Sequence, residues 1–280
     1  MIVLPARTAG SVDLSPLGPQ AARLQGTVRL TGRQVWLALD GGEAWGFART
    51  IPVPGLPALT DLQLFVAPQR RRQGIGTLLW QQVRQDLRAQ PQVSRVSAAV
   101  RRRQTPAAHF LLHHGFNLEH VEWELARSLA ADLPRPDWPA GYELTAYRRA
   151  AAIQHFICLY DASFGFTPWY QPFSEEEVEE TLQDAGDLLF AATGHEPVGV
   201  AWLRVAGRDG RIEPVGVAPS HQGRGVGRAL LEAALLALRE RGAREARLGV
   251  WRRNRPAIRL YRQFGFRPYR RTHFLAYDLD

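Results

Sequence analysis

The sequence lacks lysine and contains a single cysteine, and both shortages exclude chemistry. All 35 residues of the combined Lys and Arg total are arginine. The Walker A phosphate-binding loop and Schiff-base catalysis each require a lysine. The chain therefore has no Walker A loop and does not form a Schiff base through a lysine. The lone Cys158 forms neither an internal disulfide nor a four-cysteine zinc site. We expect it to fill space in the core.

Long apolar runs are also missing. No segment approaches the roughly 18 consecutive apolar residues of a membrane helix. The opening MIVLPARTAGSVDLSPLGP has neither the basic start nor the apolar run of a leader peptide. We therefore expect a cytoplasmic protein without a membrane partner. Hydrophobic residues make up 45% and charged residues 22% of the chain, which excludes disordered, collagen-like and coiled-coil classes.

The chain contains an internal repeat. Its 280 residues suit two domains of about 100 to 150 residues each. The segment Val66–Gly76 returns 151 positions later as Val217–Gly227. A second block returns 150 positions later, with Val100, Ala107 and Gly115–Phe116 matched by Val250, Ala257 and Gly265–Phe266. Duplicated domains follow, and the proline-rich segment 130–141 separates them. We predict domains at residues 1–135 and 136–280.

Hydrophobic periodicity predicts the same elements in each half: a hairpin, a buried strand, a glycine-rich turn, a long helix, a strand, a short helix and a final strand pair. The first half begins this series at Gln34 and therefore has fewer residues before its hairpin than the second. In the second half we predict strands at 188–192, 197–205, 212–217, 246–250 and 266–278, and helices at 225–241 and 256–264.

The glycine-rich turns occur where a strand ends and a helix begins. Backbone N–H groups in Gln222–Gly227 would face outward at a helix N-terminus, which makes a cradle for a diphosphate. The alternative is a tight turn that needs a positive φ, but its occurrence twice favours the cradle. A dinucleotide-binding fingerprint is excluded because Arg228 and Leu230 stand where its third glycine belongs.

These residues resemble the GCN5-related N-acetyltransferase (GNAT) family. Gln222–Gly227 matches its Arg/Gln-x-x-Gly-x-Gly/Ala turn, and Asn254–Phe266 matches its Asn-x-x-Ala-x-x-x-Tyr-x-x-x-Gly-Phe segment. The resemblance implies an α/β (α+β) fold of two tandem GNAT-like domains, each a mixed, mostly antiparallel, splayed sheet flanked by helices. It implies acetyl-CoA as co-substrate, with the pantetheine arm pairing along Val215–Val217.

The cofactor-binding residues that the resemblance implies lie in the second repeat. They are Val215, Gly216, Val217, Gln222, Gly223, Arg224, Gly225, Val226, Gly227, Arg228, Asn254 and Ala257. The first repeat keeps a candidate second cofactor site at Val66, Arg71, Arg72, Gly74, Ile75 and Gly76.

Acetyl transfer needs a base for the amine and an acid for the departing thiolate. The family pattern places Tyr261 as general acid, and an ordinary buried aromatic is the alternative reading. Glu213 lies four residues before Val217, so a period of two puts both on one strand face. We predict Glu213 as general base, acting directly or through water, with an ordinary strand carboxylate as the alternative.

The first repeat departs from the pattern at each catalytic position. Leu111 aligns with Tyr261 and Leu62 with Glu213, while Gln104 aligns with Asn254. A leucine neither donates nor accepts a proton. We therefore predict catalysis in the C-terminal domain and a degenerate N-terminal domain with a structural or cofactor-binding role.

The acceptor is a small-molecule or peptide amine that the sequence does not identify. The aromatic segment Phe164–Phe173 and the acids of Glu175–Glu180 could wall an acceptor pocket. The alternative is structural, because Ser174 and Glu177 have the spacing of a helix capping box. His109 and His113 have a metal-ligand spacing, but no carboxylate or cysteine cluster accompanies them, so we predict no metal.

Two other functions are open at this point. The arginine runs 70–72 and 101–103 suit a basic nucleic-acid-binding protein, although we expect no nucleic-acid partner. A protein that binds acetyl-CoA without catalysis is the other alternative, and the presence of Glu213 and Tyr261 argues against it. We expect a monomer, because a tandem chain supplies within itself the pairing of two single domains.

Overall fold

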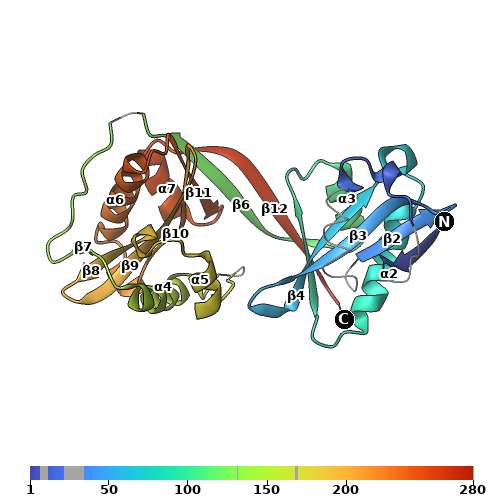
Figure 1. Cartoon of the computed structure of the whole chain (residues 1–280), viewed down its shortest axis with the longest axis horizontal. Helices are drawn as coiled ribbons and strands as arrows, with labels where there is room; N and C mark the ends of the chain where they lie inside the picture. Colours follow the sequence, from blue (N-terminus) through green and yellow to red (C-terminus); the bar gives the residue numbers. More distant parts are fainter. Residues whose placement is uncertain (7–11, 22–34, 131, 168–169, 280) are drawn as a thin grey trace. The chain divides into compact units, whose positions relative to one another are not determined.

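The computed structural model describes residues 1–6, 12–21, 35–130, 132–167 and 170–279 of the chain. It divides into two compact units (Figure 1). Residues Met1–Glu119 and Phe274–Asp280 form the first unit, and His120–His273 form the second. The division falls within the last strand of each repeat, so that each repeat contributes strand residues to the other unit. The Gln34 at which we expected the first hairpin to begin lies outside the described residues.

The first unit is a sheet with helices against it. In spatial order its strands are β1, β2, β3, β4, β5 and the end of β12. The elements run β1 Ile2–Pro5, β2 Val35–Asp40, β3 Glu43–Val53, β4 Leu56–Val66, α2 Ile75–Arg88, β5 Arg95–Val100, α3 Pro106–His113 and the start of β6 Asn117–Ser128. Short 3-10 helices cover Ser15–Leu17 and Pro68–Arg70.

The second unit repeats this plan with more helix before its hairpin. Its sheet order is β6, β11, β10, β9, β8 and β7. The elements after β6 run β7 Glu143–Thr145, α4 Arg149–Phe164, α5 Glu175–Thr181, β8 Leu188–Thr193, β9 Glu196–Ala206, β10 Asp209–Val217, α6 Val226–Glu240, β11 Glu245–Trp251, α7 Arg255–Gln263 and β12 Arg267–Asp278. Short 3-10 helices cover Ala185–Asp187 and Pro219–His221. The predicted elements of this half are confirmed to within a few residues, except that the expected final strand pair is the single strand β12.

Alternation along the strands places helices on both faces of the second sheet. On β9, Ala201 and Leu203 belong to the core cluster that α6 buries, whereas Val200 and Trp202 belong to the cluster that α4 buries. Successive side chains of a strand point to opposite faces, so one strand serves both cores. Both helices are thereby fixed against the same strands that carry the candidate site.

The sheet of each unit opens at one place. The neighbouring strands β10 and β11 run parallel and pair only through Asp209–Arg211 against Glu245–Arg247. In the first unit, β4 and β5 pair only through Leu59–Asp61 against Arg95–Ser97. The pairs β1–β2, β2–β3, β3–β4, β6–β11, β7–β8, β8–β9 and β9–β10 are antiparallel, which confirms a mixed, mostly antiparallel and splayed sheet. The ends of β4 and β10 therefore have no partner strand on their open side.

Candidate active site

The glycine-rich turn of the second repeat has the backbone geometry of an anion cradle. Gly223 and Gly225 take φ values of +74° and +89°, in the left-handed region that favours glycine. Gly225 is the N-cap of α6 and no side chain caps this end of the helix. The first backbone N–H groups of α6 thus have no helical carbonyl to bind, and the helix dipole adds positive potential there. These features fit a diphosphate.

The first repeat builds the same turn although a non-glycine residue takes one of its two left-handed positions. Gly74, the N-cap of α2, takes φ +81°, in the place that Gly225 takes in the second repeat. Arg72 takes φ +62° where the second repeat has Gly223. In both repeats a side chain from the turn donates a hydrogen bond to the last strand carbonyl. Gln222 Nε2 donates to Val217 O at 2.8 Å, and Arg71 Nε donates to Val66 O at 3.0 Å.

The free edge of β10 points toward the opening. Ala218 N–H donates to Val198 O at 2.8 Å across the antiparallel pair with β9. Because such pairs alternate, Gly216 also faces β9 with its N–H and C=O, while Val215 and Val217 turn theirs the other way. That side is where β11 has already separated. The backbone of Val215 and Val217 therefore borders the opening, with the Val217 carbonyl held by Gln222.

Glu213 lies in a bulge of β10. The register with β9 shifts between Ile212 and Val215, and the Glu213–Pro214 peptide is cis. The expectation that Glu213 shares a face with Val215 and Val217 is wrong, because the extra residue breaks the period of two. Ile212 joins the α6-facing core instead.

The carboxylate of Glu213 reaches across to β11. A Cβ on Gly249 would lie 2.9 Å from Glu213 Oε1, on the face opposite to the buried Leu248 and Val250. Arg211 holds the carboxylate with two hydrogen bonds, from Nε at 2.6 Å and from Nη2 at 3.0 Å. This bond raises the pKa of Arg211. The Glu213 side chain keeps 28% of its surface exposed.

Tyr261 is buried on α7. It is 6% exposed and belongs to the core cluster of the second unit, with its ring 5.9 Å from that of Phe266. Burial, and then the negative charge of Glu213, raise the pKa of its phenol to about 12. The phenol therefore keeps its proton at neutral pH, and the charge of the predicted base Glu213 contributes to this.

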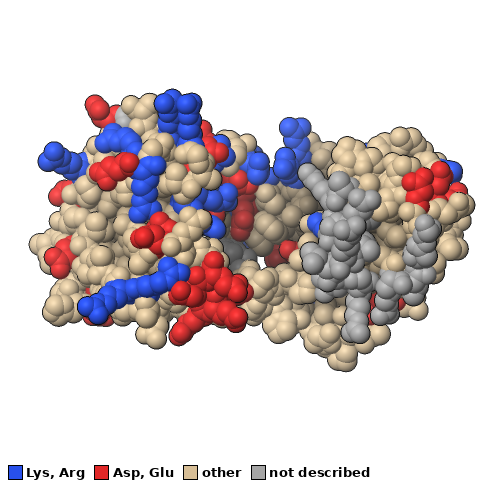
Figure 2. All heavy atoms as spheres, in the orientation of Figure 1, with Lys and Arg blue, Asp and Glu red and all other residues tan. Residues whose placement is uncertain are grey.

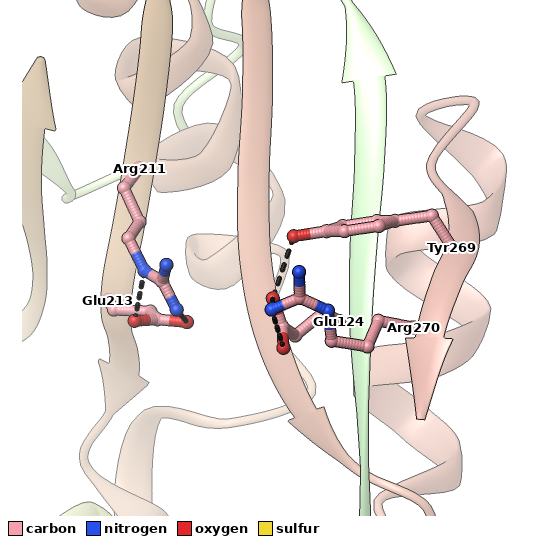
Figure 3. A network of polar contacts seen from close by, with 5 residues as sticks. All are labelled: Glu124, Arg211, Glu213, Tyr269 and Arg270. Carbon is pink, nitrogen blue, oxygen red and sulfur yellow. Dashed lines mark hydrogen bonds and ion pairs between the residues drawn. The ribbon is translucent and has the colours of Figure 1, made fainter. Parts of the chain in front are cut away.

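A second carboxylate lies beside the opening, and no motif in the sequence indicates it. Glu124 on β6 is directly opposite Gly249 in the pairing with β11. Tyr269 Oη donates to its Oε2 at 2.7 Å, and Arg270 Nη1 donates to its Oε1 at 3.2 Å (Figure 3). Burial of Glu124 alone would raise its pKa, but Tyr269 and Arg270 outweigh burial and lower it. Glu124 comes from the first repeat, and no pattern shows which sheet β6 joins.

Other predicted cofactor residues have structural contacts. Asn254 is the N-cap of α7, and its side-chain oxygen accepts a hydrogen bond from Ala257 N–H at 3.2 Å. Val226 has its side chain in the core, which leaves only its backbone for a ligand. Arg228 donates to Gln263 and lies 5.2 Å from the ring centre of Phe264.

The first repeat has core leucines at the positions of the predicted catalytic pair. Leu62 and Leu111 are each 6% exposed and lie in the core cluster of the first unit. Neither position therefore carries a titratable side chain. Ile75, by contrast, is the first residue of α2, and the glycine turn before it keeps the cradle geometry.

The structure tests the expectations for Cys158 and for the capping box of Ser174 and Glu177. Cys158 is exposed, which contradicts its expected core role, because it lies about 200° around α4 from the buried Phe156. The capping box of Ser174 and Glu177 is present at the start of α5. Of the aromatic segment 164–173, Pro168 and Trp169 lie outside the described residues. In the described part of the chain no group of His, Cys, Asp and Glu could hold a metal ion.

The surface of the second unit carries charges of both signs. Figure 2 shows arginines and acids interspersed over the part that carries α6 and α7, with acids gathered over α5. A cavity of about 300 Å³ lies at the C-terminal end of α6, lined by residues such as Asp187, Arg204 and Arg241, and none of the predicted site residues lines it. Within the described residues, no helix has the length and apolar character needed to cross a membrane.

Comparison with known proteins identifies the family. The model of the acetyltransferase (GNAT) family matches residues 12–116 and again residues 150–266. The mycothiol acetyltransferase of Nocardia farcinica is 32% identical over 246 residues, covering 83% of this chain and 78% of that protein. The mycothiol acetyltransferase of Salinispora arenicola is also 32% identical, over 74% of this chain and 69% of its own.

Solved structures share the fold. A GCN5-related N-acetyltransferase from Sphaerobacter thermophilus superposes with a TM-score of 0.75 at 23% identity, covering 92% of this chain and 85% of that one. A tandem GNAT protein from the clavulanic acid biosynthesis pathway has a TM-score of 0.64 at 21% identity, covering 99% and 93%. The class that fold and cradle define is an acetyl-CoA-dependent N-acetyltransferase. This chain belongs to the GNAT acetyltransferase family, with two family domains in tandem.

Proposed function

We propose that the chain transfers an acetyl group from acetyl-CoA to the amine of a small-molecule or peptide acceptor, and that residues 136–280 carry the chemistry. The observation that supports this most is the presence of both Glu213 and Tyr261 in the second repeat, close enough for the charge of Glu213 to act on the phenol. Glu213 reaches over Gly249, Tyr261 is buried in the core of the same unit, and burial together with Glu213 raises the pKa of the Tyr261 phenol. Residues 1–135 form a partner without catalysis, because leucines take both positions there.

The cofactor fits the second repeat by its donors. Acetyl-CoA, when bound, supplies a thioester whose acetyl group is ready for transfer. The uncapped start of α6 and the turn Gly223–Gly225 would hold the diphosphate. The outward backbone of Val215 and Val217 would hold the pantetheine arm, and the Val217 N–H is placed to stabilise charge on the acetyl oxygen. The cradle of the first repeat, from Arg71 to Gly76, is a second cofactor site without turnover.

Proton transfer then falls to two side chains. Glu213 accepts the amine proton, directly or through water, after its ion pair with Arg211 opens. Tyr261 holds a proton on Oη for the departing sulfur, and its raised pKa keeps that proton in place at neutral pH. The low exposure of Tyr261 excludes water from this exchange.

The acceptor amine would lie over Gly249. Glu213 Oε1 lies within 2.9 Å of where a Cβ on Gly249 would be, and Glu124 is opposite Gly249 on β6. Two carboxylates thus flank Gly249 and favour a cationic amine on arrival. Relatives at 32% identity carry the name mycothiol acetyltransferase, and a structural neighbour is described as a glucosamine N-acetyltransferase region. We therefore propose an acceptor of the kind that the mycothiol acetyltransferases use, acting in the cytoplasm on a monomeric enzyme without a nucleic-acid partner.

The experiment joins binding and turnover. Acetyl-CoA is titrated calorimetrically into wild type, Tyr261→Phe and Gly225→Glu, and CoA release is followed with a panel of amines that includes glucosamine and the acceptor of the mycothiol acetyltransferases. We expect Gly225→Glu to abolish the second-repeat site. Tyr261→Phe should bind acetyl-CoA within about twofold of wild type and lose at least 100-fold in turnover, the scale of acid catalysis. Unchanged turnover in Tyr261→Phe would remove it from the mechanism.

A further inference from the structure

The segment that joins the two repeats is packed against the cofactor cradle of the second. Figure 1 shows the green stretch after β6 running beside α6 to reach β7. Leu133, Trp138 and Tyr142 pack on the core cluster of the second unit. The Cγ of Pro139 lies 3.2 Å from the position a Cβ would take on Gly225, the N-cap of α6. The joining segment is therefore adjacent to the N–H groups of the cradle.

A buried carboxylate holds this segment in place. Glu232 on α6 is 5% exposed, and its Oε2 accepts a hydrogen bond from Asp137 N–H at 3.2 Å. A buried carboxylate is costly unless it is bonded, so this contact fixes the segment against α6. The first repeat has the exposed Gln81 at the matching position of α2. The anchor is thus specific to the second repeat.

Tyr142, at the end of the segment, binds two side chains of the cradle. Its Oη lies 3.0 Å from His221 Nδ1 and receives a hydrogen bond from Arg224 Nη1 at 3.4 Å. A guanidinium only donates, so Tyr142 Oη is the acceptor from Arg224, and the proton of Tyr142 remains available for His221 Nδ1. In the His221 tautomer whose Nδ1 accepts this proton, the ring hydrogen is on Nε2, where it can be donated outward.

We propose that Tyr142 is a positioning residue for the cofactor, holding Arg224 and His221 as donors to the diphosphate of CoA. This rests on the proposed function of the second cradle. Arg224 and His221 lie within or directly before the glycine turn, and each alone is a flexible exposed or half-exposed side chain. Fixing both through one phenol lowers the conformational entropy that binding must remove. The joining segment is then a working part of the cofactor site.

The test is a CoA titration in two backgrounds. Tyr142→Phe is measured in wild type and in the double variant Arg224→Ala/His221→Ala, which lacks both donors. We expect Tyr142→Phe to weaken CoA binding about five- to tenfold in wild type and less than twofold in the background without donors, because neighbours that act together are not additive. Tyr147→Phe, whose hydroxyl bonds the His195 carbonyl at 3.3 Å, is the control and should bind CoA as wild type does.

Each result is decisive. An equal loss in both backgrounds would mean that Tyr142 supports the fold rather than the donors, and an unchanged affinity in wild type would mean that it does neither; both overturn the proposal. A lowered Tm of Tyr142→Phe with equal losses would identify the structural case. Absence of any CoA binding by wild type would instead overturn the proposed function, and the role of Tyr142 with it.

Discussion

Tyr261 combines the properties of a core residue and of an acid. Its ring packs in the core of the second unit, while the negative charge of Glu213 raises the pKa of its phenol. Burial disfavours the phenolate, and a nearby carboxylate disfavours it further. Both effects hold the proton on Oη at neutral pH, which an acid for a departing thiolate requires. The two interpretations of Tyr261 from the sequence, packing and chemistry, are therefore compatible.

The raised pKa of Tyr261 predicts a loss of stability in alkali. Its folded pKa of about 12 exceeds the ordinary value of 10.0, so between these values the unfolded chain has lost a proton that the folded chain keeps. The stability contribution is complete below pH 10 and is lost as pH rises toward 12, by about 3 kcal/mol in total. Denaturant unfolding of wild type at pH 8 and pH 11.5 measures it. Tyr261→Phe should lack this component, and parallel losses in both proteins would contradict the prediction.

Gly249 tests the placement of Glu213. No positive φ is recorded at Gly249, so alanine suits the backbone, yet its Cβ would lie 2.9 Å from Glu213 Oε1. The carboxylate must move, and we expect Gly249→Ala to reduce kcat about tenfold, a part of the roughly 100- to 10,000-fold that general base catalysis supplies, with acetyl-CoA affinity unchanged. Steady-state kinetics with the best amine of the panel measures this. In a Glu213→Asp background, whose shorter carboxylate avoids the Cβ, the same change should add little; full additivity would argue against the contact.

The two glycine-rich turns have the same backbone conformation although their sequences differ. Arg72 adopts the left-handed conformation that Gly223 adopts in the second repeat. The left-handed conformation costs a residue with a Cβ about 1 to 2 kcal/mol of stability. Arg72 adopts it nonetheless, because the helix start at Gly74 fixes the path of the turn. The backbone cradle is thus kept in the first repeat even where its sequence opposes it, while the catalytic side chains are not.

Replacing Arg72 by glycine should stabilise the first unit. Relief of the left-handed strain exceeds the entropy cost of glycine, about 0.5 to 1 kcal/mol, so we expect Arg72→Gly to gain about 0.5 to 1 kcal/mol. Chemical denaturation at neutral pH measures the free energy of unfolding. Arg103→Gly, an exposed position with no positive φ, is the control and should lose stability. A loss of similar size in both variants would show that Arg72 is not strained.

The helices and strands were predictable from the sequence where one hydrophobic period dominates. The site residues were not predictable where a bulge breaks the period of a strand. Helix α6 was expected at 225–241 and occupies Val226–Glu240, because its apolar spacing leaves one face to bury. Glu213 was placed on the wrong face because a bulge at Pro214 adds a residue. Glu124 was missed altogether, since strand pairing between distant segments has no local signal. Repeats and motifs locate the cradle, whereas only three-dimensional pairing brings the carboxylates to Gly249.

At the scale of the whole molecule, the last strand of each repeat crosses into the other repeat's unit: β6 lies in the second unit from His120 onward, and β12 lies in the first unit from Phe274 onward. The first repeat provides β6, which pairs with β11 from Glu122↔Trp251 to Ser128↔Glu245. Leu125 and Leu129, 1% and 2% exposed, lie in the core of the second unit. The repeats along the chain and the compact units in space therefore do not coincide. The first repeat also supplies Glu124 to the proposed acceptor site.

This exchange predicts that residues 136–280 do not fold alone. Removing Leu125 and Leu129 from the core costs about 2 to 5 kcal/mol each, and the loss of β6 leaves β11 as an open edge. Domains are stable by only about 5 to 15 kcal/mol, so we expect residues 136–280 to aggregate and bind no CoA. A fragment of residues 117–280 restores β6 and should show cooperative unfolding by circular dichroism and recover CoA binding. Cooperative unfolding of residues 136–280 with full CoA affinity would mean that β6 is dispensable for the fold of the second unit and for cofactor binding.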